Sequence, residues 1–173
     1  MIRSIALPAL MWALGIVPVS GSGQQRANEA PERDQPAEAR ANYFDDPFLQ
    51  ITAGIPDCPV PEGPGLSRAE MRAEAHGRAD RGTSCYRAGR CRLPNSYLYD
   101  KEIIPRVRIA VEADGRFAGT SVWAEGERRW VRLKGCVRNR EQSEALEQLV
   151  REIEDVQAVV NQLVVRPPQA GAR

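Results

Sequence analysis

The chain has 173 residues, of which 42% are hydrophobic, 27% charged and 6% aromatic. This composition excludes a multi-span membrane protein, a collagen-like fibre and a wholly disordered chain. Lysine and arginine number 24 against 23 aspartates and glutamates, so the net charge is +1 at pH 7. No bulk field would attract nucleic acid, and an electrostatic partner would have to bind a local patch. The single histidine, His76, is the one obvious candidate for acid–base chemistry near neutral pH.

Residues 1–22 are typical of a secretory signal peptide. Arg3 precedes an uncharged apolar run over residues 5–19, and the small residues SGSG follow it, which is the order that signal peptidase accepts. The run is shorter than the roughly 20 apolar residues that cross a bilayer. A retained N-terminal anchor is the alternative. We expect cleavage near Gly21 to Gly23, a periplasmic or secreted location, and no transmembrane segment in the mature chain.

Two segments are predicted to lack a fixed structure. Residues 23–46 consist mostly of Ala, Pro, Glu and Arg, with no large apolar side chain before Tyr43. Such a segment buries too little surface to offset its chain entropy, and we expect a disordered tether. Residues 167–173 are expected to form a flexible tail.

All four cysteines lie in the part of the chain that export would deliver to an oxidising compartment, where an even number indicates disulfides. Cys85 and Cys91 enclose five residues that include a glycine and are the natural local pair. Cys58 and Cys136 would then form a long-range disulfide. The alternative is a small metal- or redox-active site that uses these cysteines with His76. The spacings match no zinc motif and contain no C-x-x-C pair, so we expect no metal and no cofactor.

Residues 47–99 are rich in Cys, Pro and Gly and resemble no family. We expect an irregular, disulfide-bonded segment that packs on the C-terminal domain. Within it, Ser67 and Glu70 have the spacing of a capping box, which predicts a short helix that ends at Gly77 or near Asp80. His76 on this helix is most simply a solvated side chain.

The pattern becomes regular from about residue 100. Apolar residues at helical spacing predict a helix that Gly115 ends. Asn139 and Gln142 have the spacing of a helix cap, and the helix that follows carries one apolar stripe. The remaining expected elements are a strand at 120–124, a turn at 126–128, a strand at 130–137, the capped helix through residue 154 and a strand at 156–165. Two helices on one face of a three-stranded mixed sheet (α-β-β-α-β) would make a two-layer α+β domain.

Two stretches of this region resemble the BON domain, the bacterial osmotic-shock and nodulation module. They are VRLKGCV at 131–137 and DVQAVVNQLVV at 155–165, separated by a helix of the expected length. The resemblance covers residues 100–166. It implies a small non-catalytic module of exported proteins that associates with phospholipid or envelope partners. The chain departs from the pattern in an apparently longer turn before Trp130 and in Asp155, where the family usually has glycine.

Two features of the second strand have competing interpretations. Gly135 lies inside an alternating strand, where a glycine indicates that another group comes close to the backbone. The favoured interpretation is the approach of a helix, and the alternative is contact with a ligand. The face opposite the helices would carry indole rings and basic side chains that suit phosphate head groups. Alternatively, residues 47–99 cover this face, since a bare apolar sheet face is uncommon in a monomer. The candidate lipid or partner residues are Trp123, Trp130, Arg132, Lys134 and Arg138.

Together these features predict an exported, non-enzymatic binding or adaptor protein of the bacterial cell envelope. Its partner would be an envelope protein or a phospholipid surface, not nucleic acid. The alternative hypothesis of an enzymatic function would depend on His76 alone, since the sequence offers no set of nucleophile, base and orienting group.

Overall fold

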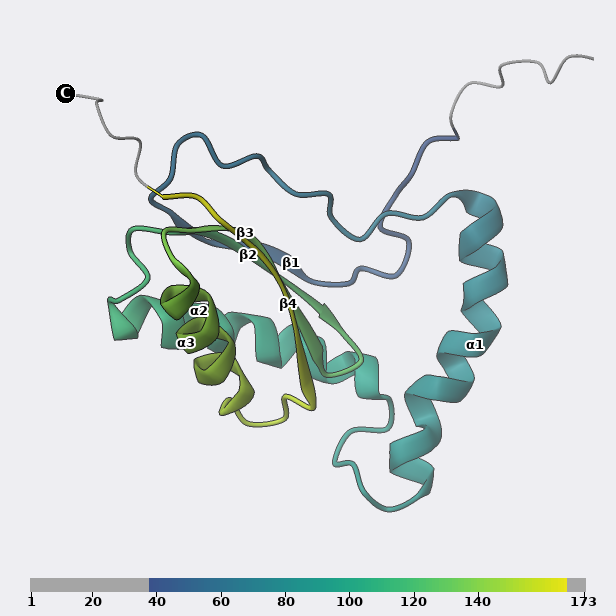
Figure 1. Cartoon of the computed structure of the whole chain (residues 1–173). Coiled ribbons are helices and arrows are strands. Elements are labelled where there is room, and N and C mark those ends of the chain that lie inside the picture. The colour runs from purple at the N-terminus through teal and green to yellow at the C-terminus, as the bar shows by residue number, and fades with distance from the viewer. Residues whose placement is uncertain (1–37, 168–173) are drawn as a thin grey trace, which may run out of the picture. The chain divides into compact units, whose positions relative to one another are not determined.

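The structure is a computed structural model that describes residues 38–167 (Figure 1). The predicted signal peptide, the first part of the predicted tether and most of the predicted tail lie outside the described residues. The elements are, in order, β1 (Phe48–Ala53), α1 (Arg68–Arg87), a 3-10 helix η1 (Ser96–Tyr99), α2 (Asp100–Asp114), β2 (Ser121–Glu127), β3 (Trp130–Val137), α3 (Arg140–Arg151) and β4 (Ala158–Val165).

The strands form one mixed sheet in the order β1-β2-β3-β4. The β1–β2 and β2–β3 pairs are antiparallel, and the β3–β4 pair is parallel. Figure 1 shows α2 and α3 on one face of the sheet, with the chain after β1 running along the other face. The two-layer α+β arrangement of residues 100–166 is therefore as predicted, with a fourth strand added at the sheet edge.

The main core lies between the sheet and the two helices. In β3 the alternate residues Val131, Leu133 and Val137 are fully buried there, because successive side chains of a strand point to opposite faces. Helix α3 buries Leu146 and Val150 against them, and its N-cap is the predicted one: the Asn139 side chain accepts a hydrogen bond from the Gln142 amide at 2.8 Å. This helix ends at Arg151, three residues before the predicted end.

The segment predicted to be irregular contains a strand and a long helix. Strand β1 pairs with β2 through residues that are about 75 positions apart in the chain, so its partner could not be identified from local pattern. Helix α1 starts at the predicted Ser67–Glu70 capping box and continues to Arg87, past both predicted ends. Within this longer helix Gly82 packs against Asn95, where a Cβ atom would lie 2.4 Å from the amide oxygen.

The tether was predicted to run to Asp46, but its last residues belong to the folded unit. Ala41 forms a backbone bridge with Leu66, and Asp46 forms an ion pair with Arg78 of α1. The composition of the segment did not indicate this, because the contacts are made by single side chains and not by an apolar run.

The turn between β2 and β3 also differs from the prediction. Its two residues are Arg128 and Arg129, with φ angles of 55° and 68°, so the hairpin is short and not elongated. Gly126, which was expected in the turn, lies in β2. A Cβ atom there would be 2.9 Å from Ile104 of α2. The close approach of a helix to the sheet therefore occurs at Gly126.

The structure gives another reason for a glycine at position 135 than the expected approach of a helix. Its φ angle is +114°, and a Cβ atom would lie 2.2 Å from the Ser121 carbonyl oxygen and 3.0 Å from the Trp123 ring. The residue is required by its backbone conformation and by the neighbouring strand, not by a helix. Asp155 also has a positive φ of 71°, which Asp tolerates better than most residues.

Candidate functional site

The structure contains the two expected disulfides, Cys58–Cys136 and Cys85–Cys91. The first joins β3 to the covering segment, which we define as residues 54–66. Ile55, Cys58, Trp123 and Cys136 form a second small core on the face of the sheet opposite the helices. Trp123 is only 5% exposed. The arrangement is thus the covered alternative, in which the Cys-bearing segment closes part of this face.

The basic side chains of the candidate lipid face have partners within the protein. Lys134 forms an ion pair with Glu125 at 2.5 Å and donates a hydrogen bond to the Glu62 carbonyl oxygen at 2.9 Å. Arg132 pairs with Glu127 at 2.6 Å. Arg138 donates to two backbone carbonyl oxygens, at 3.3 Å each. An anionic head group would have to compete with these contacts.

Trp130, the remaining residue of that candidate face, lies at the start of β3 beside the hairpin turn. Its ring is half-buried, with the Arg128 guanidinium 5.8 Å from the ring centroid. The structure therefore does not bring the five candidate residues into one open surface. Trp123 is buried, the three basic residues are paired, and Trp130 lies at the end of the strand.

A buried carboxylate holds the β2–β3 turn. Asp100, the first residue of α2, is fully buried and accepts hydrogen bonds from the Arg128 and Arg129 amides at 2.6 and 2.7 Å. These contacts explain how two arginines occupy a turn that usually contains Asn or Gly. Burial raises the pKa of Asp100 to about 7, against the opposing effect of the two amides.

A largely buried ion pair fastens α1 next to this turn. Arg78 contacts both carboxylate oxygens of Asp46, at 2.5 and 3.0 Å. Its guanidinium lies between the rings of Phe44 and Tyr97, at 4.2 and 3.8 Å from their centroids. Burial raises the pKa of Asp46 even beside this cation. The role of this group is structural, since both charges are satisfied by each other.

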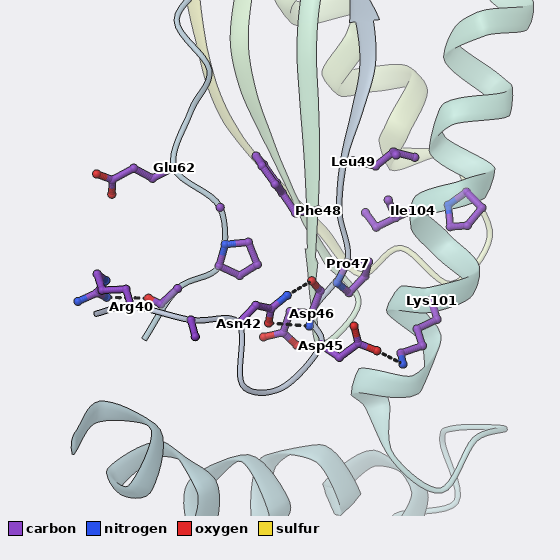
Figure 2. A pocket seen from close by; sticks show the side chains of 15 residues that line it. Arg40, Asn42, Asp45, Asp46, Pro47, Phe48, Leu49, Glu62, Lys101 and Ile104 are labelled. Atoms are coloured by element: carbon purple, nitrogen blue, oxygen red, sulfur yellow. Dashed lines mark hydrogen bonds and ion pairs between the residues drawn. The ribbon is translucent and has the colours of Figure 1, made fainter. Parts of the chain in front are cut away.

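A large hollow lies beside β1, with a volume of about 860 Å³ (Figure 2). We call it the β1 groove. Phe48 and Leu49 form its centre, α2 forms one wall, and the covering segment with Arg40 forms the other. Figure 2 shows these walls on the two sides of the strand, with the Asn42–Asp46 loop at one end. Of its fifteen lining residues six are polar or charged, and the remainder are apolar residues and glycines. Apolar walls with polar groups placed among them are typical of binding sites.

The structure offers His76 no catalytic setting. The ring is largely exposed and lies 3.4 Å from Asp80 on the next turn of α1. Within residues 38–167 no group of three or more His, Cys, Asp or Glu residues could hold a metal ion. All four cysteines are in disulfides. Across the same range, no helix has both the length and the apolar character needed to cross a membrane.

Sequence reasoning missed the β1 groove and the residues that fasten α1. The available signals were weak: FLQIT at 48–52 alternates only in part, and Asp46 and Arg78 are ordinary charged residues in the sequence. The pairing between β1 and β2 creates the groove, and that pairing depends on contacts that are distant in the chain.

Comparison with known proteins gives one family. The family model of the BON domain matches residues 99–167. No curated protein matches the chain. The matched range begins one residue before α2 and runs past β4, so it contains the helices and strands of the predicted module but not β1 or α1. BON domains are generally non-catalytic, and the match indicates a binding module of the membrane or cell envelope, which the disulfides also fit. The C-terminal part of this chain, residues 99–167, is a BON domain.

Proposed function

We propose that this protein is an exported, non-catalytic adaptor of the bacterial cell envelope that binds a protein partner through the β1 groove. The groove itself carries the proposal: it has a volume of about 860 Å³, and β1 and the covering segment that line it lie outside the BON domain. The N-terminal extension thus covers part of one face of the domain and adds a binding site at its edge. The signal-like order of residues 1–22 and the disulfides support a location in the periplasm or outside the cell.

A protein partner is favoured over a phospholipid surface because of how the basic residues are used. Arg132 and Lys134 form ion pairs with Glu127 and Glu125. Releasing them would leave buried or half-buried carboxylates without a partner, which is costly. The alternative of a metal- or redox-active protein has no specific observation in its favour.

Site-specific photo-crosslinking in living cells tests the proposal. A photoreactive amino acid replaces Glu62, an exposed residue on the wall of the groove, and in a matched control it replaces Arg140, an exposed residue on α3. We expect irradiation to give a discrete adduct with an envelope protein from position 62 and none from position 140. Adducts from neither position, or adducts with lipid only, would contradict a protein partner at the groove.

A further inference from the structure

The β1 groove lies along a free edge of the sheet. Strand β1 is the first in the order β1-β2-β3-β4 and pairs on one side only, with β2. An edge strand presents unpaired N–H and C=O groups that can pair with another extended chain. In this protein the edge is flanked by walls on both sides, so the site could accept the side chains of an added strand as well as its backbone.

The register identifies which backbone groups are free. The Gly126 amide donates to the Pro47 carbonyl oxygen at 2.9 Å, so Pro47 and Gly126 are a hydrogen-bonded pair. Hydrogen-bonded and non-hydrogen-bonded pairs alternate along an antiparallel ladder. Phe48, opposite Glu125, and Gln50, opposite Trp123, are therefore in non-hydrogen-bonded positions. Their N–H and C=O groups point away from β2, toward the free edge.

The free edge is open over the first part of β1 and less so beyond it. The Gln50 side chain donates to the Thr52 carbonyl oxygen at 3.3 Å, and the register shifts between these two residues. A shift of this kind interrupts regular pairing. Phe48 and Leu49, just before it, are the β1 residues that line the groove. The groove and the free backbone groups thus coincide.

The two walls differ in character. On the helix side, Leu49 packs at the margin of the main core beside Ile104 and Pro105 of α2. Ile109 lies one turn beyond Pro105 and is 66% exposed, which extends this apolar surface along the helix. On the other side the wall is the Gly- and Pro-rich stretch 62–65 with the polar side chains of Arg40 and Glu62. An added strand would meet an apolar wall on one face and a polar wall on the other.

We infer that the β1 groove binds an extended segment of another protein, which adds a strand to the sheet at β1. Its alternate apolar side chains would face α2, and its polar side chains would face residues 62–65. The open part of β1 runs from Phe48 to Gln50, before the register shift, so the added strand would pair over about three residues, or about 10 Å. The inference rests on the proposed function and specifies how its partner is bound.

A displayed library of random nonapeptides, selected on the exported chain, tests the inference. We expect enriched peptides with apolar residues at every second position. One such peptide is then synthesised, together with a control that carries N-methyl groups on alternate amides. The control keeps the side chains but lacks the N–H groups that would bond to β1, so it should not bind. Amide hydrogen exchange should slow at Phe48 and Gln50 when the unmodified peptide is added.

Two variants separate backbone pairing from side-chain contact. Gln50→Pro removes the outward N–H without removing a bond to β2, and proline is tolerated at such edge positions. It should weaken peptide binding by about tenfold or more, while the matched Gln50→Ala should change it by less than about threefold. Thermal unfolding of both variants shows that the fold is retained.

The inference fails if no peptide is enriched, or if enriched peptides bind Gln50→Pro equally and leave the Phe48 and Gln50 amides unprotected. It also fails if these amides are protected without peptide in a concentration-dependent way, because the occupant would then be a second copy of this chain. A protein adduct from position 62 that persists in Gln50→Pro would retain the proposed function and reject strand addition alone.

Discussion

Removing the Cys58–Cys136 disulfide should destabilise the protein far more than removing Cys85–Cys91. The two bridges join cysteines that are 78 and 6 positions apart. On the chain-entropy model, closing loops of these sizes stabilises the fold by about 4.5 and about 2.4 kcal/mol. The long-range bridge also belongs to the small core with Trp123, and its loss removes packing that the other bridge does not provide. We therefore expect a difference of about 2 kcal/mol or more between the two double variants.

The assay is urea denaturation of Cys58→Ala/Cys136→Ala and of Cys85→Ala/Cys91→Ala, each compared with the intact protein. In a Trp12→Phe/Trp130→Phe background, which leaves Trp123 as the one tryptophan, its fluorescence should shift to longer wavelength without denaturant in the first variant only, because the covering segment would no longer exclude water. Equal losses of stability, or an unchanged Trp123 spectrum after removal of the long-range bridge, would refute the idea that this disulfide holds the covering segment on the sheet.

Three further substitutions, two of them with a matched control, test other parts of the structure. Asp100 has a pKa of about 7 when folded, well above its unfolded value, so stability should fall by about 1.4 kcal/mol from pH 6 to pH 8, and Asp100→Asn should show a flatter profile in thermal unfolding. Gly135→Ala should lower the free energy of unfolding by about 3 kcal/mol or more, measured by chemical denaturation. The matched Gly115→Ala should lower it by only about 1–2 kcal/mol, because position 115 also has a positive φ but has open space around it. Arg78→Ala should unfold α1 and lower the free energy of unfolding by about 3 kcal/mol, measured by circular dichroism. Arg108→Ala, at an exposed ion pair, should do neither. A flat pH profile of the intact protein, equal glycine effects or an intact α1 would contradict these three arguments.

The parts of the fold that could be predicted from sequence are those with local causes. Asn139 caps a helix with a clear apolar stripe, and the alternation of β3 places Val131 and Leu133 on the core side. The cysteine pairs followed from one short loop, which left a single partner for each remaining cysteine. These inferences start from residues within a few positions of one another, and the Cys58–Cys136 pair, 78 positions apart, followed by elimination.

The parts that could not be predicted depend on contacts between distant residues. Asp100 looks like an ordinary acidic residue at a helix start, yet it is buried because it binds the turn 28 residues later. Asp46 and Arg78 are 32 positions apart, and each is unremarkable in its own segment. Strand β1 exists because β2 offers it an edge, so the groove beside it had no signal in the sequence.

The central claim is that the sheet face is partly covered and its basic side chains have partners within the protein, so that binding occurs at the β1 groove and not at a lipid surface. Co-sedimentation of the exported protein with anionic and with neutral vesicles tests it most directly, with Arg132→Ala/Lys134→Ala as the matched variant. We predict that both proteins stay in the supernatant with both vesicles, even at low salt. Pelleting of the intact protein with anionic vesicles that is weakened by salt and lost in the double variant would contradict the account.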